Sequence, residues 1–296
     1  MYPNRKNKDA LFDYVLLGVL LAITLISFLP LMHMVAVSFS DKTAVAGGRV
    51  TLIPINPTLA AYEAVMSDNA FFTAFGVSIQ RVLIGVSINF VITAITAFAL
   101  SRSSREFRGR NIYIWLLVFT MMFSTGLIPW YLNIRNLGLL DTIWALVLPG
   151  AVPVFNVILL MNYFRNLPKE IDEAAMIDGA APLRMLTAIY LPMSLPALAT
   201  VTLFSIVNHW NAFFDGLILM NRQVNYPLQT YLNQIVIQFN VANAHMTQEE
   251  INRLLKLSDK TVSASKILVG MIPILIVYPF LQKYFVTGIT LGSIKE

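Results

Sequence analysis

Long apolar runs alternate with short polar segments along this 296-residue chain. A helix of roughly 20 apolar residues is long enough to cross the hydrocarbon core of a bilayer. The pattern therefore predicts six membrane-spanning helices, at about 14–40, 82–101, 112–131, 142–164, 193–219 and 267–286. Together they predict one polytopic, all-α membrane domain that covers residues 1–296.

The first apolar run follows Arg5, Lys6 and Lys8, and a cleaved signal peptide begins in the same way. The run at 14–40 is longer than a signal core of about 7 to 15 residues, and more spans follow it. We therefore expect it to be a retained first span.

The polar positions within and between the other runs predict local features. Residues 41–70 are rich in turn formers and predict an extramembrane loop with one short helix near 60–66. Arg81 precedes the second run, and we expect its charged head to reach the outer interface. Breakers in the fourth run, Pro149-Gly150 and Pro153, are tolerated only where protein or a cavity satisfies the freed carbonyls.

Composition and charge support a membrane protein. The chain is 57% hydrophobic and only 12% charged, which excludes an ordinary soluble domain. Its net charge of +5 arises from short basic clusters between apolar runs, such as the four arginines of 102–110. The positive-inside rule puts that loop, and with it both termini, in the cytoplasm. This distribution does not favour nucleic-acid binding.

Catalytic and metal-binding patterns are missing from the sequence. There is no cysteine, and no G-x-x-x-x-G-K-[ST] phosphate loop occurs. The three histidines, His33, His209 and His245, have no metal-ligand spacing, so we expect packed or solvated side chains. We predict that the chain is not an enzyme and binds no cofactor or metal itself.

The polar segment between the fourth and fifth runs predicts a bent pair of helices. Pro168 suits the first turn of a helix, and Asp172 and Glu173 lie near its positive end. Gly179 permits a left-handed turn, after which Pro182 can start a second helix. We expect a helix-turn-helix elbow at the end of a span.

The same segment carries a motif, E-A-A, three residues, G, nine residues, I-x-L-P, that resembles the signature cytoplasmic loop of ABC importer permeases. The resemblance implies a coupling loop over 165–191 that sits in a groove of a separate ATP-hydrolysing subunit. The alternative is an ordinary amphipathic interfacial helix. The positions assigned to docking are Glu173, Ala174, Ala175, Asp178, Gly179, Pro182, Ile189, Leu191 and Pro192.

Polar groups also interrupt the fifth apolar run. Asn208, Trp210, Asn211 and Asp215 place amides and a carboxylate beside aromatic rings. Polar residues in a membrane helix normally face a cavity or a partner, and amides beside aromatic rings suit a sugar. These four residues are candidate substrate contacts, and the alternative is hydrogen bonding between helices.

A wider resemblance covers nearly the whole chain. It is carried by Trp210-Asn211-x-Phe213, by Ala97–Arg102, and by 281–288 with Gly292-Ser293. These segments resemble carbohydrate permeases of the maltose-transporter type, in the subgroup for complex polysaccharide and oligosaccharide uptake. The resemblance implies the type I ABC importer permease fold in the cytoplasmic membrane.

The partners implied are a second homologous permease, two ATP-binding subunits that use ATP and Mg, and an extracytoplasmic solute-binding protein. The long outer segment 221–266 could dock or gate such a partner, or could pack as a solvated loop. A rival function is a stand-alone secondary transporter of a small polar solute. That class is expected to use mid-membrane carboxylates, whereas only Asp215, near the end of a run, is present.

Overall fold

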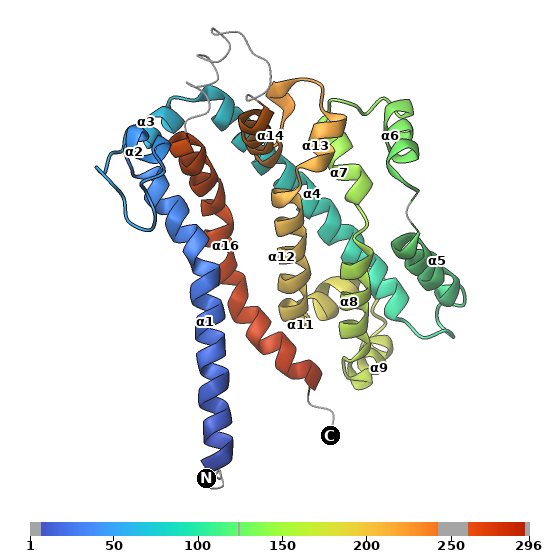
Figure 1. Ribbon diagram of the computed structural model, residues 1–296. Helices are drawn as coiled ribbons and strands as arrows, with labels where there is room; N and C mark the ends of the chain where they lie inside the picture. The colour runs from blue at the N-terminus through green and yellow to red at the C-terminus, as the bar shows by residue number, and fades with distance from the viewer. Residues whose placement is uncertain (1–6, 124, 242–259, 294–296) are drawn as a thin grey trace. The chain divides into compact units, whose positions relative to one another are not determined.

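The computed structural model describes residues 7–123, 125–241 and 260–293, and every regular element in these ranges is a helix (Figure 1). Within these ranges, three helices are long and apolar enough to cross a membrane, over Phe12–Ser38, Asn69–Ser101 and Lys260–Pro279. The total rises to six if each of three bent helix pairs is one span. The all-α membrane architecture is confirmed.

The chain divides into two compact units. The first comprises residues 1–69 and 234–270, and the second comprises residues 70–233 and 271–296. Three helices contribute residues to both units: α14 (Leu228–Val241), α16 (Lys260–Ser293) and α4 (Asn69–Ser101), of which only Asn69 lies in the first unit.

The first unit contains α1 (Asn7–Ser38), α2 (Lys42–Ala46), α3 (Ala60–Met66) and the beginning of α16. The helix α3 confirms the short helix predicted near 60–66. Polar contacts fasten this loop region within its unit: the Ser38 hydroxyl lies 2.9 Å from the Tyr62 hydroxyl. Lys266 Nζ donates to Asp68 Oδ2 at 2.5 Å.

The second unit is organised on α4 (Asn69–Ser101). This helix begins well before residue 82, where the second span was predicted to start. The extra turns place Arg81 inside the helix, and its side chain is only 3% exposed. Arg81 therefore does not reach outward to an interface as expected. It lies on the buried face of α4.

The predicted third, fourth and fifth spans are each divided in two. The third contains α5 (Arg110–Met122) and α6 (Leu127–Asn136). In the fourth, α7 (Ile143–Val147) and η1 (Leu148–Gly150) meet α8 (Val154–Arg165) at 45°. The fifth runs as α12 (Leu195–Asn211) and resumes as α13 (Phe214–Leu219). Hydropathy alone did not predict these breaks, except at the prolines of the fourth run.

The polar segment after α8 has the predicted shape of an elbow. Its first arm is α9 (Lys169–Ile177), and Gly179 follows with φ +68, a left-handed conformation. Pro182 is the first residue of the second arm, which comprises α10 (Pro182–Met185), η2 (Leu186–Tyr190) and α11 (Leu191–Met193). This arm lies at 88° to α12.

The segment 221–266, predicted as an outer loop, is mostly helical where it is described. It contains η3 (Gln223–Asn225), α14 and the first residues of α16. Residues 242–259, with His245, lie outside the described residues.

Candidate functional site

A polar stripe lies on the buried face of α4. Ser78, Arg81, Asn89 and Thr93 are each at most 3% exposed and are spaced three, eight and four residues apart, which places them on one side of a helix. Exposed apolar side chains such as Leu83 lie elsewhere on the same helix. A membrane helix turns its polar groups toward protein because lipid cannot satisfy them.

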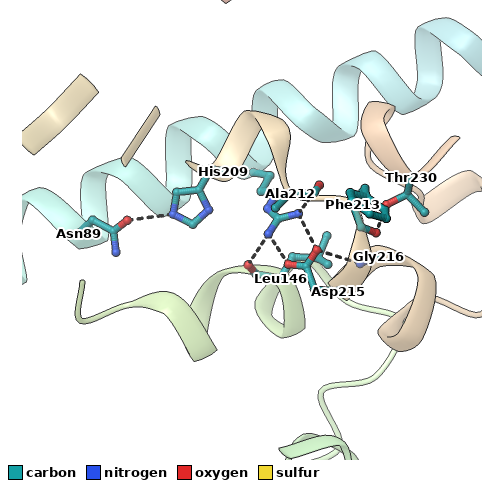
Figure 2. A network of polar contacts seen from close by, with 9 residues as sticks. Asn89, Leu146, His209, Ala212, Phe213, Asp215, Gly216 and Thr230 are labelled. Atoms are coloured by element: carbon teal, nitrogen blue, oxygen red, sulfur yellow. Dashed lines mark hydrogen bonds and ion pairs between the residues drawn. The ribbon is translucent and has the colours of Figure 1, made fainter. Parts of the chain in front are cut away.

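Arg81 connects the breaks in two spans, and its partners Leu146, Ala212 and Asp215 are labelled in Figure 2. Its Nη1 donates to Asp215 Oδ1 at 3.1 Å, and its Nη2 forms a second bond to Oδ2 of the same carboxylate. The guanidinium also donates to the carbonyls of Leu146, in α7, and Ala212, between α12 and α13, both at 3.3 Å. One buried cation thus satisfies backbone groups near both breaks.

Asn89 makes a similar connection two turns further along α4. Its Nδ2 donates to the carbonyls of Gly150 at 2.8 Å and Ala151 at 3.0 Å, in the break of the fourth span. Its Oδ1 lies 2.9 Å from Nε2 of the buried His209 (Figure 2). Since the amide oxygen can only accept, Nε2 carries the proton in this arrangement.

Gly85 lies between these two anchors and leaves room for the imidazole. A Cβ at position 85 would lie 2.5 Å from His209 Nε2, which is too close for any side chain. Asn89 thus satisfies two carbonyls in this break, which agrees with the expectation that protein or a cavity satisfies the carbonyls freed there. His209 is a packed side chain, as expected.

Three of the four candidate substrate contacts line one cavity of about 630 Å³. Asn208 and Asn211 contribute amides, and Asp215 contributes its carboxylate. The aromatic rings of the lining belong to Trp130, Phe213 and Phe214.

Trp210 does not line this cavity. It is 4% exposed and packs edge-on against Phe75, with ring centroids 5.6 Å apart. Trp210 faces α4 rather than the cavity in this structure, so its assignment as a substrate contact stays a prediction. Trp130, on α6, supplies an indole to the cavity instead.

A second cavity of about 340 Å³ shares Asn208 with the first. Its lining adds Asn89, Asn156 and Ser205, together with the rings of Phe155 and Phe204. Asn156 Nδ2 donates to the Val201 carbonyl and to Ser205 Oγ, both at 3.1 Å. Asn156 thus connects α8 to α12, and Asn208 lines both cavities. Among the four candidate contacts, the predicted alternative of hydrogen bonding between helices applies to Asp215, which Arg81 of α4 binds.

The predicted docking residues of the elbow divide into two groups. Ala175, Ile189 and Leu191 pack on the core around Tyr190, and Ala175 is only 6% exposed. Ala175 therefore does not face outward. The exposed members of the set are Glu173, Ala174, Asp178, Gly179, Pro182 and Pro192.

Large apolar side chains that the motif did not single out are exposed beside them. Met176, Ile177 and Leu183 are 50%, 85% and 68% exposed. They lie on both arms of the elbow, next to the acidic side chain of Glu173. Among the described residues, no group of three His, Asp or Glu side chains could hold a metal ion.

Known proteins resemble the chain over almost its full length. A family model described as binding-protein-dependent transport system inner membrane component matches residues 82–291. The polygalacturonan/rhamnogalacturonan transport system permease protein YtcP of Bacillus subtilis (strain 168) is 39% identical over 97% of this chain and 99% of its own. Protein LplC of the same strain is 38% identical over 91% of this chain and 90% of its own.

A solved structure gives the same result. It belongs to a bacterial ABC transporter involved in the import of the acidic polysaccharide alginate. One of its chains is 34% identical, with a TM-score of 0.85 over 96% of this chain and 100% of that chain. The predicted resemblance to sugar importer permeases and the predicted fold are confirmed.

Proposed function

Because this chain belongs to the family of binding-protein-dependent transport system inner membrane components, we propose that it is the permease subunit of an ATP-driven carbohydrate importer. It would form half of the translocation path and couple to a separate ATPase. The observation that carries the proposal is similarity over nearly the whole chain to a permease of a polysaccharide transport system. The family does not support the rival, a stand-alone secondary transporter.

Carbohydrate, most simply an oligosaccharide, is the proposed substrate class. The relatives named above include a polygalacturonan/rhamnogalacturonan system and an alginate importer. The larger cavity suits this chemistry, because Asn208 and Asn211 can bond hydroxyl groups while Trp130 can stack on the apolar face of a sugar ring. Asp215 is bonded to Arg81, so its carboxylate would act on the sugar mainly as part of the Arg81–Asp215 pair.

The exposed face of the elbow is the proposed docking site of the ATPase subunit. Met176, Ile177 and Leu183 form an apolar surface outside the spans, and Glu173 adds a charge beside it. An apolar surface exposed at the end of a membrane span is typical of a protein interface. Ala175, Ile189 and Leu191 would support this face from within.

The remaining partners follow from the family. They would be a second homologous permease, a second ATP-binding subunit and an extracytoplasmic solute-binding protein, with ATP and Mg used by the ATPases. The elbow and both termini would lie in the cytoplasm, and the segment 221–266 would face the binding protein. The chain itself would make and break no covalent bond.

Co-purification tests the proposal most directly. The tagged full-length chain should bring down one further permease and an ATP-binding subunit from its native membrane, identified by mass spectrometry. A chain that is purified alone and transports sugar without ATPase would overturn it.

Uptake of labelled oligosaccharides tests the substrate path. With oligogalacturonides and maltooligosaccharides as probes, Asn208→Ala or Asn211→Ala should raise the half-saturating concentration about fivefold, since one lost hydrogen bond costs about 1 kcal/mol. Asn136→Ala, an exposed asparagine on α6, is the matched control. Equal half-saturating concentrations for all three variants would contradict a role of the cavity in the translocation path.

A further inference from the structure

Three side chains from different elements meet behind the exposed face of the elbow. Arg102 follows the end of α4, Asp172 lies in the first turn of α9, and Tyr190 ends η2. Arg102 Nη1 donates to Asp172 Oδ2 at 3.2 Å. The Tyr190 hydroxyl lies 2.6 and 2.7 Å from the two oxygens of the same carboxylate, and Arg102 Nη2 also contacts this hydroxyl.

Aromatic rings enclose the arginine of this cluster. The Arg102 guanidinium carbon lies 4.6 Å from the ring centroids of both Phe98 and Tyr190. Tyr190 is 3% exposed and also meets Phe164 edge-on, with centroids 5.2 Å apart. Phe98 belongs to α4 and Phe164 to α8, so the cluster joins the elbow to two spans.

The end of α4 is held from other directions as well. Arg110 Nη1 donates to the carbonyl of Arg102 at 2.8 Å, and Arg165 Nη2 donates to that of Leu100 at 3.0 Å. The last carbonyls of a helix have no partner within it, and cationic donors satisfy them well. Donors from α5 and α8 therefore hold the backbone at Arg102, while its side chain contacts Asp172.

Local backbone structure brings Tyr190 to the cluster. Residues Leu186–Tyr190 form a π-helix, which has an extra residue per turn and so changes the direction of the side chains along it, including Tyr190 at its end. On α9, Asp172 and Glu173 are neighbours that point in different directions, since successive helical residues differ by about 100°. Asp172 faces the cluster, and Glu173 is exposed.

We propose that Arg102, Asp172 and Tyr190 form the joint that transmits movement of α9 to α4 and α8. This proposal depends on the proposed docking of the elbow onto an ATPase subunit. The joint makes α9 and the end of α4 move as one body when the ATPases close. The three residues are positioning residues, because they touch neither sugar nor nucleotide. Glu173 meets the ATPase, and Asp172 connects the same helix to the spans.

Asp172→Asn is the main test, because it removes the charge and weakens two bonds while keeping the shape. In the full complex reconstituted in proteoliposomes, this variant should keep its ATPase subunits and most of its ATP hydrolysis. The number of sugars imported per ATP hydrolysed should fall at least about threefold, within the range that substitutions along coupling networks produce. Asp172→Glu, which keeps the charge, should recover part of the loss.

Glu170→Gln is the matched control. Glu170 is an exposed acidic residue in the same first turn of α9, and its loss should leave the ratio unchanged. If Asp172→Asn does not accumulate in membranes, Tyr190→Phe decides by the same ratio, since it removes one hydroxyl and keeps the ring. An unchanged ratio in the variant that is measured would overturn the proposal.

A distance measurement separates the joint from a merely structural role. The chain has no native cysteine, so spin labels at Glu170→Cys on α9 and Leu83→Cys on α4 are the only ones that it carries. On ATP binding, their separation should stay constant in the wild-type background and change in the Asp172→Asn background. A separation that changes equally in both backgrounds contradicts a joint. If no ATPase subunit binds the wild-type chain, the docking proposal fails instead.

Discussion

Two arginine–aspartate pairs, one within α4 and one directly after its end, differ in their surroundings. In the pair Arg81–Asp215, the arginine is 3% and the aspartate 20% exposed, and the guanidinium also binds two backbone carbonyls. In the pair Arg102–Asp172, the corresponding values are 14% and 25%, and the arginine lies between two aromatic rings. At 1.5 Å per residue, roughly 30 Å of helix separates the two arginines.

The difference indicates two different tasks for the same chemistry. Arg81 is surrounded by the broken ends of two spans, so its removal would leave buried groups without partners. At Arg102, two other arginines bond the backbone carbonyls at the end of α4. Its side chain connects to α9, a helix that carries an exposed apolar face. We expect the first pair to determine stability and the second to determine coupling.

The largest effect should come from Asp215→Ala. It leaves the buried guanidinium of Arg81 without a counter-ion, and breaking a buried pair in this way costs about 3 to 5 kcal/mol in the free energy of unfolding. The variant should give little folded protein in detergent, with a clearly lower midpoint in thermal denaturation. Arg81→Met combined with Asp215→Leu should recover part of the loss, because no charge remains unpaired. A wild-type midpoint for Asp215→Ala alone would refute a stabilising pair.

A smaller effect is expected for Gly85→Ala. The new methyl group would displace His209 from Asn89, at a cost of about 1 to 3 kcal/mol for overpacking. Gly76→Ala on the same helix is the control, since nothing lies within 4 Å of a Cβ there. It should raise stability by about 0.5 to 1 kcal/mol, as alanine does in a helix interior. Thermal denaturation of both variants should therefore give shifts of opposite sign.

Asp172→Asn should change stability less than either of these. The site is partly exposed, and an amide still accepts a hydrogen bond, so the free energy of unfolding should fall by about 1 kcal/mol. A loss comparable to that of Asp215→Ala, measured under the same conditions, would show that the second pair is also a structural one. The contrast between the two pairs would then disappear.

The smallest effect belongs to a third pair, Arg222–Asp141, whose arginine is 70% exposed. Arg222→Gln should lower the free energy of unfolding by at most about 1 kcal/mol near pH 7, as the loss of an exposed pair does.

Burial alone would raise the pKa of Asp141, but hydrogen bonds from Asn225, Arg222 and Asn221 hold it well below the usual range. Because the pKa of Asp141 is lower in the folded than in the unfolded state, its charged carboxylate stabilises the fold at pH values above the unfolded-state pKa. This stabilisation is lost as the pH falls toward and through the folded-state pKa. Wild type and Arg222→Gln should thus converge in stability on acidification below about pH 4. A gap between their thermal midpoints that stays constant below pH 4 would contradict the assignment.

Several features were predictable because they depend on neighbours in the sequence. The elbow follows from the order of Pro168, Gly179 and Pro182, and each adopts the backbone conformation or helix position that its chemistry favours. The short helix at 60–66 follows from the turn formers around it. The membrane class follows from the length of the apolar runs alone.

Other features needed contacts between distant segments. Arg81 and Asp215 are 134 residues apart, so a local pattern could only suggest that Arg81 lies near an interface. Trp210 and Asn211 are adjacent, yet one packs against Phe75 and the other lines the cavity. The hydropathy of a run does not reveal which side of its helix faces protein.

The sequence by itself determined that this is a helical membrane permease with an elbow between two of its apolar runs, because apolar length and motif spacing are properties of the chain read in order. Only the tertiary structure decided where the spans break, which charges pair and which side chains reach the cavity. The reason is that a buried charge or a freed carbonyl is stabilised by whichever polar group packing brings to it. That group can come from any segment of the chain.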